Sequence, residues 1–166
     1  MSGTIYIVGT PIGNLSDFSP RAIETLKRVD FIAAEDTRVT LKLLNHFDIV
    51  KPLVSYHEHN LRQRGEVIIG RVLAGENAAI VSDAGMPCVS DPGEDLVRLA
   101  AEAGIQTVVI PGPSAAIPAP CLSGLPTPRF AFEGFLSTTR NNRRAHLLTV
   151  RTPPHTLISR ARPPTV

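Results

Sequence analysis

Short apolar runs alternate with amphipathic stretches along roughly the first two thirds of the chain. The apolar runs are typical of strands buried on both faces of a parallel sheet, and the amphipathic stretches carry apolar residues at helical spacing. This alternation predicts an α/β fold with a mostly parallel five-stranded sheet and helices on both faces. We predict strands at 4–9, 31–34, 53–55, 78–81 and 107–110, and helices at 21–28, 39–47, 64–73 and 91–104.

A second pattern begins after the proline-rich run Leu125-Pro126-Thr127-Pro128. It predicts a strand, a helix and a further short strand, at 130–135, 143–150 and 156–158. So few elements cannot close a core of their own. We therefore expect an N-terminal α/β domain, a linker and an incomplete second α/β domain, at 1–122, 123–128 and 129–166.

The run from Ser82 to Gly93 joins the fourth predicted strand to the helix that follows it. Asp91 is a favourable N-cap, Pro92 suits the first helical position, and Glu94 completes the spacing of a capping box. We therefore predict that the helix starts there. A loop at the carboxyl end of a parallel strand is where open α/β sheets bind ligands, so this run is a candidate binding loop.

Polar or glycine-rich turns follow every predicted strand of the first domain. Because the carboxyl ends of parallel strands meet at one edge of a sheet, we expect these turns to form one wall of a single cleft. The turns are 9–14, 35–38, 56–60, 82–93 and 111–115.

The composition is that of a globular chain, with 43% hydrophobic and 19% charged residues. No apolar run reaches the length of a membrane span and the start lacks the order of a secretory signal, so we expect a cytoplasmic protein without membrane contact. Cys88 and Cys121 lack disulfide or metal spacing. His57 and His59 lack a convincing third ligand, so we predict no metal site.

Positive charge gathers at the end of the chain, although the net charge is only +2. No Asp or Glu follows Glu133, whereas arginines stand at 140, 143, 144, 151, 160 and 162. A basic segment of this kind suits a polyanion such as RNA. The alternative is a basic helix face that is simply solvated.

The motifs together closely resemble the ribosomal RNA small subunit methyltransferase I family, a branch of the tetrapyrrole methylase superfamily. The resemblance covers roughly residues 4 to 158 and is specific, because several matching runs are long and unusual in composition. The matching runs are 10–15 with Asp17, 35–38, 55–60, 82–93, 111–115, 123–126 and 134–136.

This resemblance implies a methyl transfer from S-adenosyl-L-methionine to the ribose 2′-hydroxyl of a cytidine in small-subunit (16S) ribosomal RNA. It also implies a cofactor held between two α/β domains, with contacts at Pro11, Ile12, Asp83, Gly85, Met86, Ser114, Ala115 and Ile158. The types of residue at these positions suit such a cofactor. Gly85 allows close backbone approach, Asp83 suits the amino end of the methionine portion, and Ser114 is expected at a helix N-terminus that suits a carboxylate. The alternative is that Asp83 only caps its own turn.

RNA contacts are expected at Arg38, His59, Arg140, Arg143 and Arg144. A general base would help to remove the proton of the 2′-hydroxyl group. The sequence leaves its identity open among Glu35, Asp36 and His57. The alternative for Glu35, Asp36 and Arg38 is an acidic helix start with a surface ion pair.

Two positions depart from the family pattern. Met86 stands where relatives usually have Thr, which removes a hydroxyl group beside the cofactor. After Ile158 the family pattern is lost, so we expect a truncated second domain. The resemblance further implies a homodimer whose partner is small-subunit ribosomal RNA. Two other functions stay open: methylation of a tetrapyrrole, and an inactive fragment that only binds RNA or a partner.

Overall fold

The computed structural model describes residues 1–57, 61–151 and 155–160. The chain divides into two compact units, residues 1–114 and 115–166, and each is described by itself. Within the described ranges, no helix combines the length and the apolar character that a membrane crossing requires.

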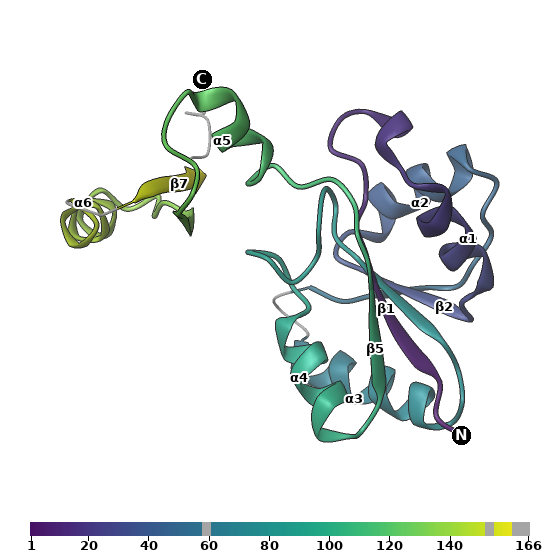
Figure 1. The fold of residues 1–166 in the computed structure, drawn as a ribbon. Coiled ribbons are helices and arrows are strands. Elements are labelled where there is room, and N and C mark those ends of the chain that lie inside the picture. The colour runs from purple at the N-terminus through teal and green to yellow at the C-terminus, as the bar shows by residue number, and fades with distance from the viewer. Residues whose placement is uncertain (58–60, 152–154, 161–166) are drawn as a thin grey trace. The chain divides into compact units, whose positions relative to one another are not determined.

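Parallel strands form the sheet of the first unit: β1 (Thr4–Val8), β2 (Phe31–Ala34), β3 (Leu53–Ser55), β4 (Ala78–Val81) and β5 (Gln106–Ile110). Hydrogen bonds pair them in the order β3-β2-β4-β1-β5. Every residue of β2 and β4 is buried, as their apolar sequences require. The predicted α/β fold with a five-stranded parallel sheet is confirmed (Figure 1).

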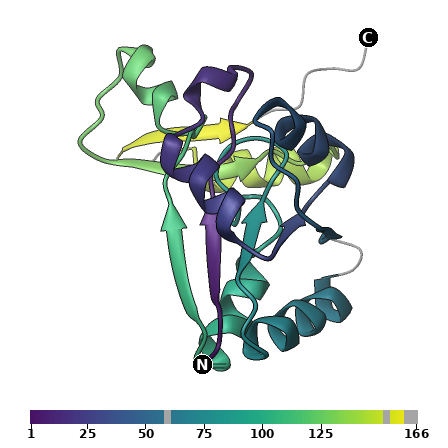
Figure 2. The same cartoon turned by 90° about the vertical axis from the view of Figure 1, so that its right-hand side faces the viewer.

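Helices connect these strands: η1 (Leu15–Asp17, a 3-10 turn), α1 (Pro20–Arg28), α2 (Thr37–His46), α3 (Leu61–Leu73) and α4 (Glu94–Glu102). Leu26 of α1 and Leu44 of α2 are buried in one core cluster. Ile68 of α3 and Leu96 of α4 are buried in the other. Strand residues alternate between the two clusters, so helices cover both faces of the sheet (Figures 1 and 2).

The connections reverse direction at the centre of the sheet. From β1 the chain passes through α1 to β2, on the far side of β4, whereas from β4 it passes through α4 to β5, on the far side of β1. The neighbours β1 and β4 therefore mark a topological switch point. Ligands of open α/β sheets bind outside the carboxyl ends of the strands at such a point.

The predicted start of α4 is wrong. The helix begins at Glu94, and its N-cap is Gly93 at a φ of 133°, without a side-chain cap. Cys88 and Ser90 also have positive φ values, of 68° and 63°. A Cβ atom on Gly93 would lie 2.6 Å from the Sγ atom of Cys88, so the tight loop needs glycine there. Loop packing thus overrides the local capping signal of Asp91 and Pro92.

The second unit contains α5 (Pro118–Ser123), β6 (Phe130–Phe135), α6 (Arg140–Thr149) and β7 (Thr156–Arg160). β6 and β7 pair in parallel, and Ile158 of β7 is buried opposite Phe132. No residue of α6 is buried. The helix α5 was not predicted from the sequence. The domain limits at 122 and 129 stay a prediction.

Leu96 is the best test of the core, because its side chain is fully buried between α4 and the sheet. We expect Leu96→Ala to lower the free energy of unfolding by about 2–5 kcal/mol, through reduced burial and a residual cavity. Leu73→Ala is the matched control, since Leu73 is 51% exposed at the end of α3, and we expect a change within about 0.5 kcal/mol. Urea denaturation measures both, and equal losses of stability would contradict the assigned core.

Candidate functional site at the carboxyl ends of the strands

The loops after β1 and β4 are joined by an isolated antiparallel bridge between Thr10 and Gly85. The Thr10 N–H donates to the Gly85 carbonyl at 2.9 Å, and the Gly85 N–H donates to the Thr10 carbonyl at 3.1 Å. The buried Thr10 hydroxyl donates to the Ser82 carbonyl at 3.1 Å. The two loops therefore hold each other at the switch point.

The loop after β5 packs against the loop after β1 through a close approach of two glycines, Gly112 and Gly9. A Cβ atom on Gly9 would lie 2.7 Å from the Gly112 Cα atom and 2.6 Å from the Sδ atom of Met86. Gly85 has a φ of 92°, and a Cβ atom there would lie 3.2 Å from Cδ1 of Ile12. The structure thus brings together Ile12, Gly85 and Met86, three of the predicted cofactor residues, from loops far apart in the sequence.

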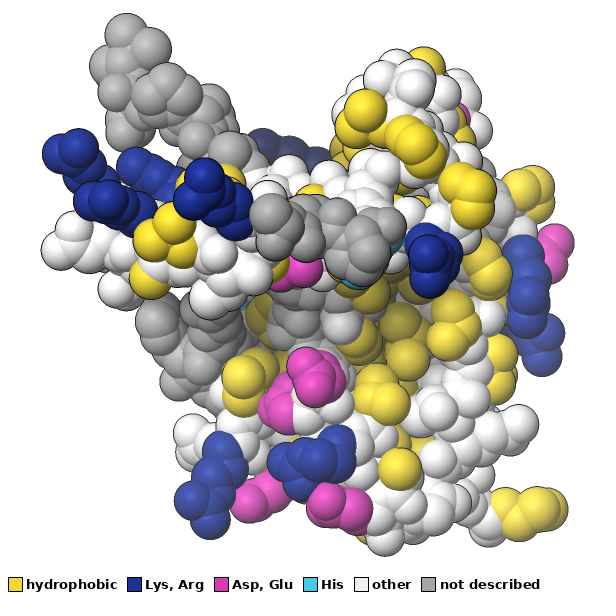
Figure 3. All heavy atoms as spheres, turned by 60° about the vertical axis from the view of Figure 1, so that its left-hand side comes forward, with side chains coloured by type: hydrophobic (Ala, Val, Ile, Leu, Met, Phe, Trp, Pro, Cys, Tyr) yellow, Lys and Arg dark blue, Asp and Glu magenta, His cyan; other side chains and the backbone are white. Residues whose placement is uncertain are grey.

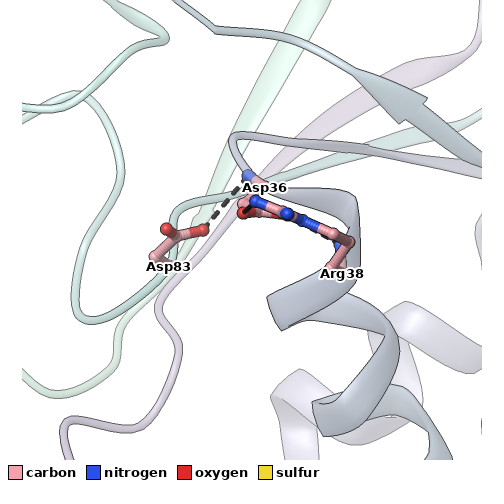
Figure 4. A network of polar contacts seen from close by, with 3 residues as sticks. All are labelled: Asp36, Arg38 and Asp83. Atoms are coloured by element: carbon pink, nitrogen blue, oxygen red, sulfur yellow. Dashed lines mark hydrogen bonds and ion pairs between the residues drawn. The ribbon is translucent and has the colours of Figure 1, made fainter.

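The loop after β2 is tied to the same place through Asp36. Its backbone N–H donates to Oδ1 of Asp83 at 3.1 Å (Figure 4). Its carboxylate accepts a hydrogen bond from the Arg38 N–H and so caps α2. The same carboxylate accepts hydrogen bonds from Nε and Nη2 of the Arg38 guanidinium, at 3.0 and 2.6 Å. This bidentate contact lowers the pKa of Asp36 to about 2.

Asp83 is shifted in the opposite direction. Partial burial raises the pKa of its carboxyl group, and the neighbouring Asp36 carboxylate adds to the rise. The hydrogen bond from the Asp36 N–H opposes it. The Asp83 N–H in turn faces Oε2 of Glu35 at 3.5 Å. The predicted residues Glu35, Asp36, Arg38 and Asp83 are therefore one connected group.

The loop after β3 is anchored by Tyr56. Its buried hydroxyl group donates to Oδ2 of Asp95 at 2.6 Å, and burial together with that carboxylate raises the pKa of Tyr56. His57 follows, half-buried. His59 lies outside the described residues, so its predicted RNA contact stays a prediction.

A cavity of about 350 Å³ opens beside this group, between the loop after β1 and one face of α2. Its lining includes two polar residues that were not predicted from the sequence, Lys42 and His46. The sequence predicted only a helix at 39–47, because the helical spacing of Val39 and Leu43 does not distinguish a cavity wall from a core position. The lining residues are Thr10, Pro11, Gly13, Asn14, Leu15, Val39, Thr40, Lys42, Leu43, His46, Ser82 and Asp83.

Ser114 ends the first unit, and its predicted place at a helix N-terminus is wrong because α5 begins only at Pro118. Ala115 and Ile158 belong to the second unit. So do the predicted RNA-contact residues Arg140, Arg143 and Arg144, which line a second hollow of about 370 Å³ on α6 with Leu147, Leu148 and Arg151. Lys and Arg side chains gather at the upper left of Figure 3.

Comparison with known proteins identifies the family. Residues 4–163 match the family described as Tetrapyrrole (Corrin/Porphyrin) Methylases. The chain belongs to this family. Among its curated relatives, a protein from Synechocystis sp. named Ribosomal RNA small subunit methyltransferase I is 56% identical over 146 residues, 88% of this chain and 52% of the relative.

The protein of the same name from Pseudomonas aeruginosa is 50% identical over 157 residues, 95% of this chain and 56% of the relative. These relatives confirm the predicted resemblance to the ribosomal RNA small subunit methyltransferase I family. The chain spans about half the length of the curated relatives it matches.

Solved structures agree on the fold. Diphthine synthase superposes with a TM-score of 0.67 at 19% identity, over 96% of this chain and 64% of that chain. Uroporphyrin-III-C-methyltransferase from Thermus thermophilus superposes with a TM-score of 0.60 at 22% identity, over 81% of this chain and 60% of that chain. Both support the tetrapyrrole methylase fold.

Gly9 tests the convergence of the loops. We expect Gly9→Ala to destabilise the protein by about 1–3 kcal/mol, because the added methyl group meets the backbone of Gly112, which cannot move away without shifting the loop after β5. Gly70→Ala within α3 is the control. Nothing lies within 4 Å of a Cβ atom there, so alanine should stabilise the helix by about 0.5–1 kcal/mol. Thermal unfolding measures both, and a stabilising Gly9→Ala would refute the close approach.

Proposed function

We propose that this protein takes part in methylating the ribose 2′-hydroxyl group of a cytidine in small-subunit ribosomal RNA, with S-adenosylmethionine as methyl donor. The observation that carries the proposal is the convergence of Ile12, Asp36, Asp83 and Gly85 at the switch point of the sheet. The relatives named as ribosomal RNA methyltransferases support the substrate class. A cytoplasmic location and a homodimer belong to the same proposal, and the homodimer rests on the resemblance.

The residues present fit the methyl donor. Asp83 offers a carboxylate whose pKa is raised by partial burial, and a cationic amino group beside it would offset that cost. Gly85, without a side chain and at positive φ, lets a ligand approach the backbone beside Ile12. Pro11, Met86, Ser114, Ala115 and Ile158 complete the proposed contacts. When bound, S-adenosylmethionine supplies an activated methyl group.

The three candidate bases differ in what surrounds them. The pKa of Asp36 is about 2 and its two carboxylate oxygens are engaged by Arg38, so it is a poor proton acceptor near neutral pH. We assign Asp36 a positioning role, because its N–H holds the Asp83 carboxylate. Glu35 and His57 stay the candidates for the base.

RNA is proposed to bind through Arg38 and through the basic face of α6. Arg38 is exposed even though it pairs with Asp36, which leaves its guanidinium accessible to a phosphate. On α6, Arg140, Arg143 and Arg144 lie with Leu147 and Leu148 around one hollow. Arginine beside apolar surface suits both the phosphates and the bases of a single strand.

Methyl transfer tests the function directly. We expect a chimera of this chain with the half of the Synechocystis relative that it does not match to incorporate labelled methyl groups into small ribosomal subunits, at a ribose 2′-hydroxyl. Asp83→Ala should weaken binding of S-adenosylmethionine, measured by calorimetry, by about 1–3 kcal/mol, since the substitution removes a hydrogen-bonded charge.

Glu24→Ala is the matched control, because Glu24 is an exposed carboxylate on α1 away from the site. It should leave cofactor affinity unchanged. Methylation of a base instead of a ribose would refute the proposed function. Equal affinity of the parent and Asp83→Ala for the cofactor would refute the assignment of Asp83.

The basic face of α6 is tested by salt. Replacing Arg140, Arg143 and Arg144 by Ala should weaken binding of a single-stranded RNA, because fewer phosphates are neutralised. The slope of log K against log salt should fall by up to about two units, since each neutralised phosphate of a single strand adds about 0.7 to it. Fluorescence anisotropy across a salt series measures the slope. An unchanged slope would show that these arginines form only a solvated face.

A further inference from the structure

We propose that the cavity between the loop after β1 and α2 holds the acceptor nucleotide of a single-stranded RNA, with its base between apolar walls and its phosphate at Lys42 and His46. This inference rests on the proposed function and names the substrate pocket of the same site. The cavity measures about 350 Å³, within the range of small-molecule sites in proteins.

The position of the cavity separates it from most of the proposed cofactor contacts. Met86 packs against the core cluster that lies under α3 and α4. The cavity instead lies against α2, which packs on the opposite face of the sheet. Asp83 and Pro11 are the residues that the two regions share, so a nucleotide in the cavity would lie next to the proposed methyl donor.

Apolar side chains that stay at least partly exposed form the walls. Leu15 of η1 is 42% exposed and Val39 of α2 is 38% exposed. Leu43 is only half-buried and lies one turn of α2 beyond Val39. Exposed apolar side chains around a hollow indicate a ligand with a flat apolar part, such as a base.

A lysine and a histidine lie on the same face of α2. Lys42 and His46 are four residues apart, so their side chains are neighbours on the helix surface, and both line the cavity. Both are exposed, and Lys42 forms no ion pair with any residue in the described ranges. A phosphate group is the natural partner for a lysine and a histidine so placed.

Ser82 supplies the remaining observation. Its side chain lines the cavity and is only 3% exposed, yet its Oγ atom has no hydrogen-bond partner among the described residues. Buried hydroxyl groups in native proteins are normally paired, so this one is available to a ligand. A hydroxyl donor and acceptor beside Asp83 fits a ribose hydroxyl group or the edge of a base. Apolar walls, a lysine, a histidine and this buried hydroxyl together favour a nucleotide over a purely apolar ligand.

The test uses the full 166-residue chain labelled with ¹⁵N and cytidine 5′-monophosphate as the probe. Saturable amide shifts are expected within residues 10–15 and 39–46. A short oligocytidine RNA should shift the same amides. Absence of saturable shifts there, or binding of the mononucleotide without the RNA, would overturn the proposal.

Two variants probe the contacts. Lys42→Ala should weaken binding of the mononucleotide about three- to tenfold, the effect expected for one contact to a partly exposed phosphate, and leave binding of cytidine unchanged. Lys27→Ala on α1 is the matched control, because Lys27 is an exposed helical lysine outside the cavity.

Val39→Trp should fill the cavity and abolish binding of both probes, and its amide spectrum reports whether it folds. Equal affinities of the parent and Lys42→Ala would overturn the phosphate contact.

The cofactor gives the remaining outcome. S-adenosylhomocysteine is expected to shift Gly85 and Gly112 and to leave the α2 amides in place. If it shifts α2 and displaces the mononucleotide, the cavity belongs to the cofactor and this inference fails while the proposed function stands. If nucleotide binding behaves as expected but the chimera transfers no methyl group, the pocket stands and the proposed function fails.

Discussion

The backbone bridge between Thr10 and Gly85 is the constraint on which the carboxyl edge of the sheet depends. It joins the loops that follow the central strands β1 and β4. It is reinforced by the buried Thr10 hydroxyl, which donates to the Ser82 carbonyl. Without that hydroxyl, a buried carbonyl group would lose a donor. The contact between Gly9 and Gly112 then adds the third loop. Small side chains and main-chain hydrogen bonds, more than salt bridges, hold this edge together.

Charge divides the two aspartates of this edge into different roles. Arg38 neutralises Asp36 and lowers its pKa to about 2, whereas partial burial raises the pKa of Asp83. Neighbouring carboxyl groups whose environments push their pKa values in opposite directions can take different roles in one site. Arg38 forms its ion pair with Asp36, so the carboxyl group of Asp83 has no ion pair among the described residues and a cationic group of a ligand could pair with it.

The strands of the first unit could be predicted because buried parallel strands carry a strong local signal, as in Ala78–Val81. The start of α4 could not, because the positive φ values of Cys88, Ser90 and Gly93 come from packing within the loop. The turns of the cleft were predictable as a set from their common place at strand ends. The cavity was not, since nothing in the amphipathic pattern of α2 distinguishes Val39, which lines the cavity, from the buried Leu44.

The strand order also bears on how the chain assembles during synthesis. β1 leaves the ribosome first, but its two partners, β4 and β5, begin only at Ala78 and Gln106. Until then Ile5 and Ile7, which are buried in the finished protein, have no sheet neighbour. A nascent chain with such late partners exposes apolar side chains and unpaired backbone groups of β1 until Gln106 has been added. The central strand that organises the finished site is therefore also a segment that needs protection from aggregation while the chain is being made.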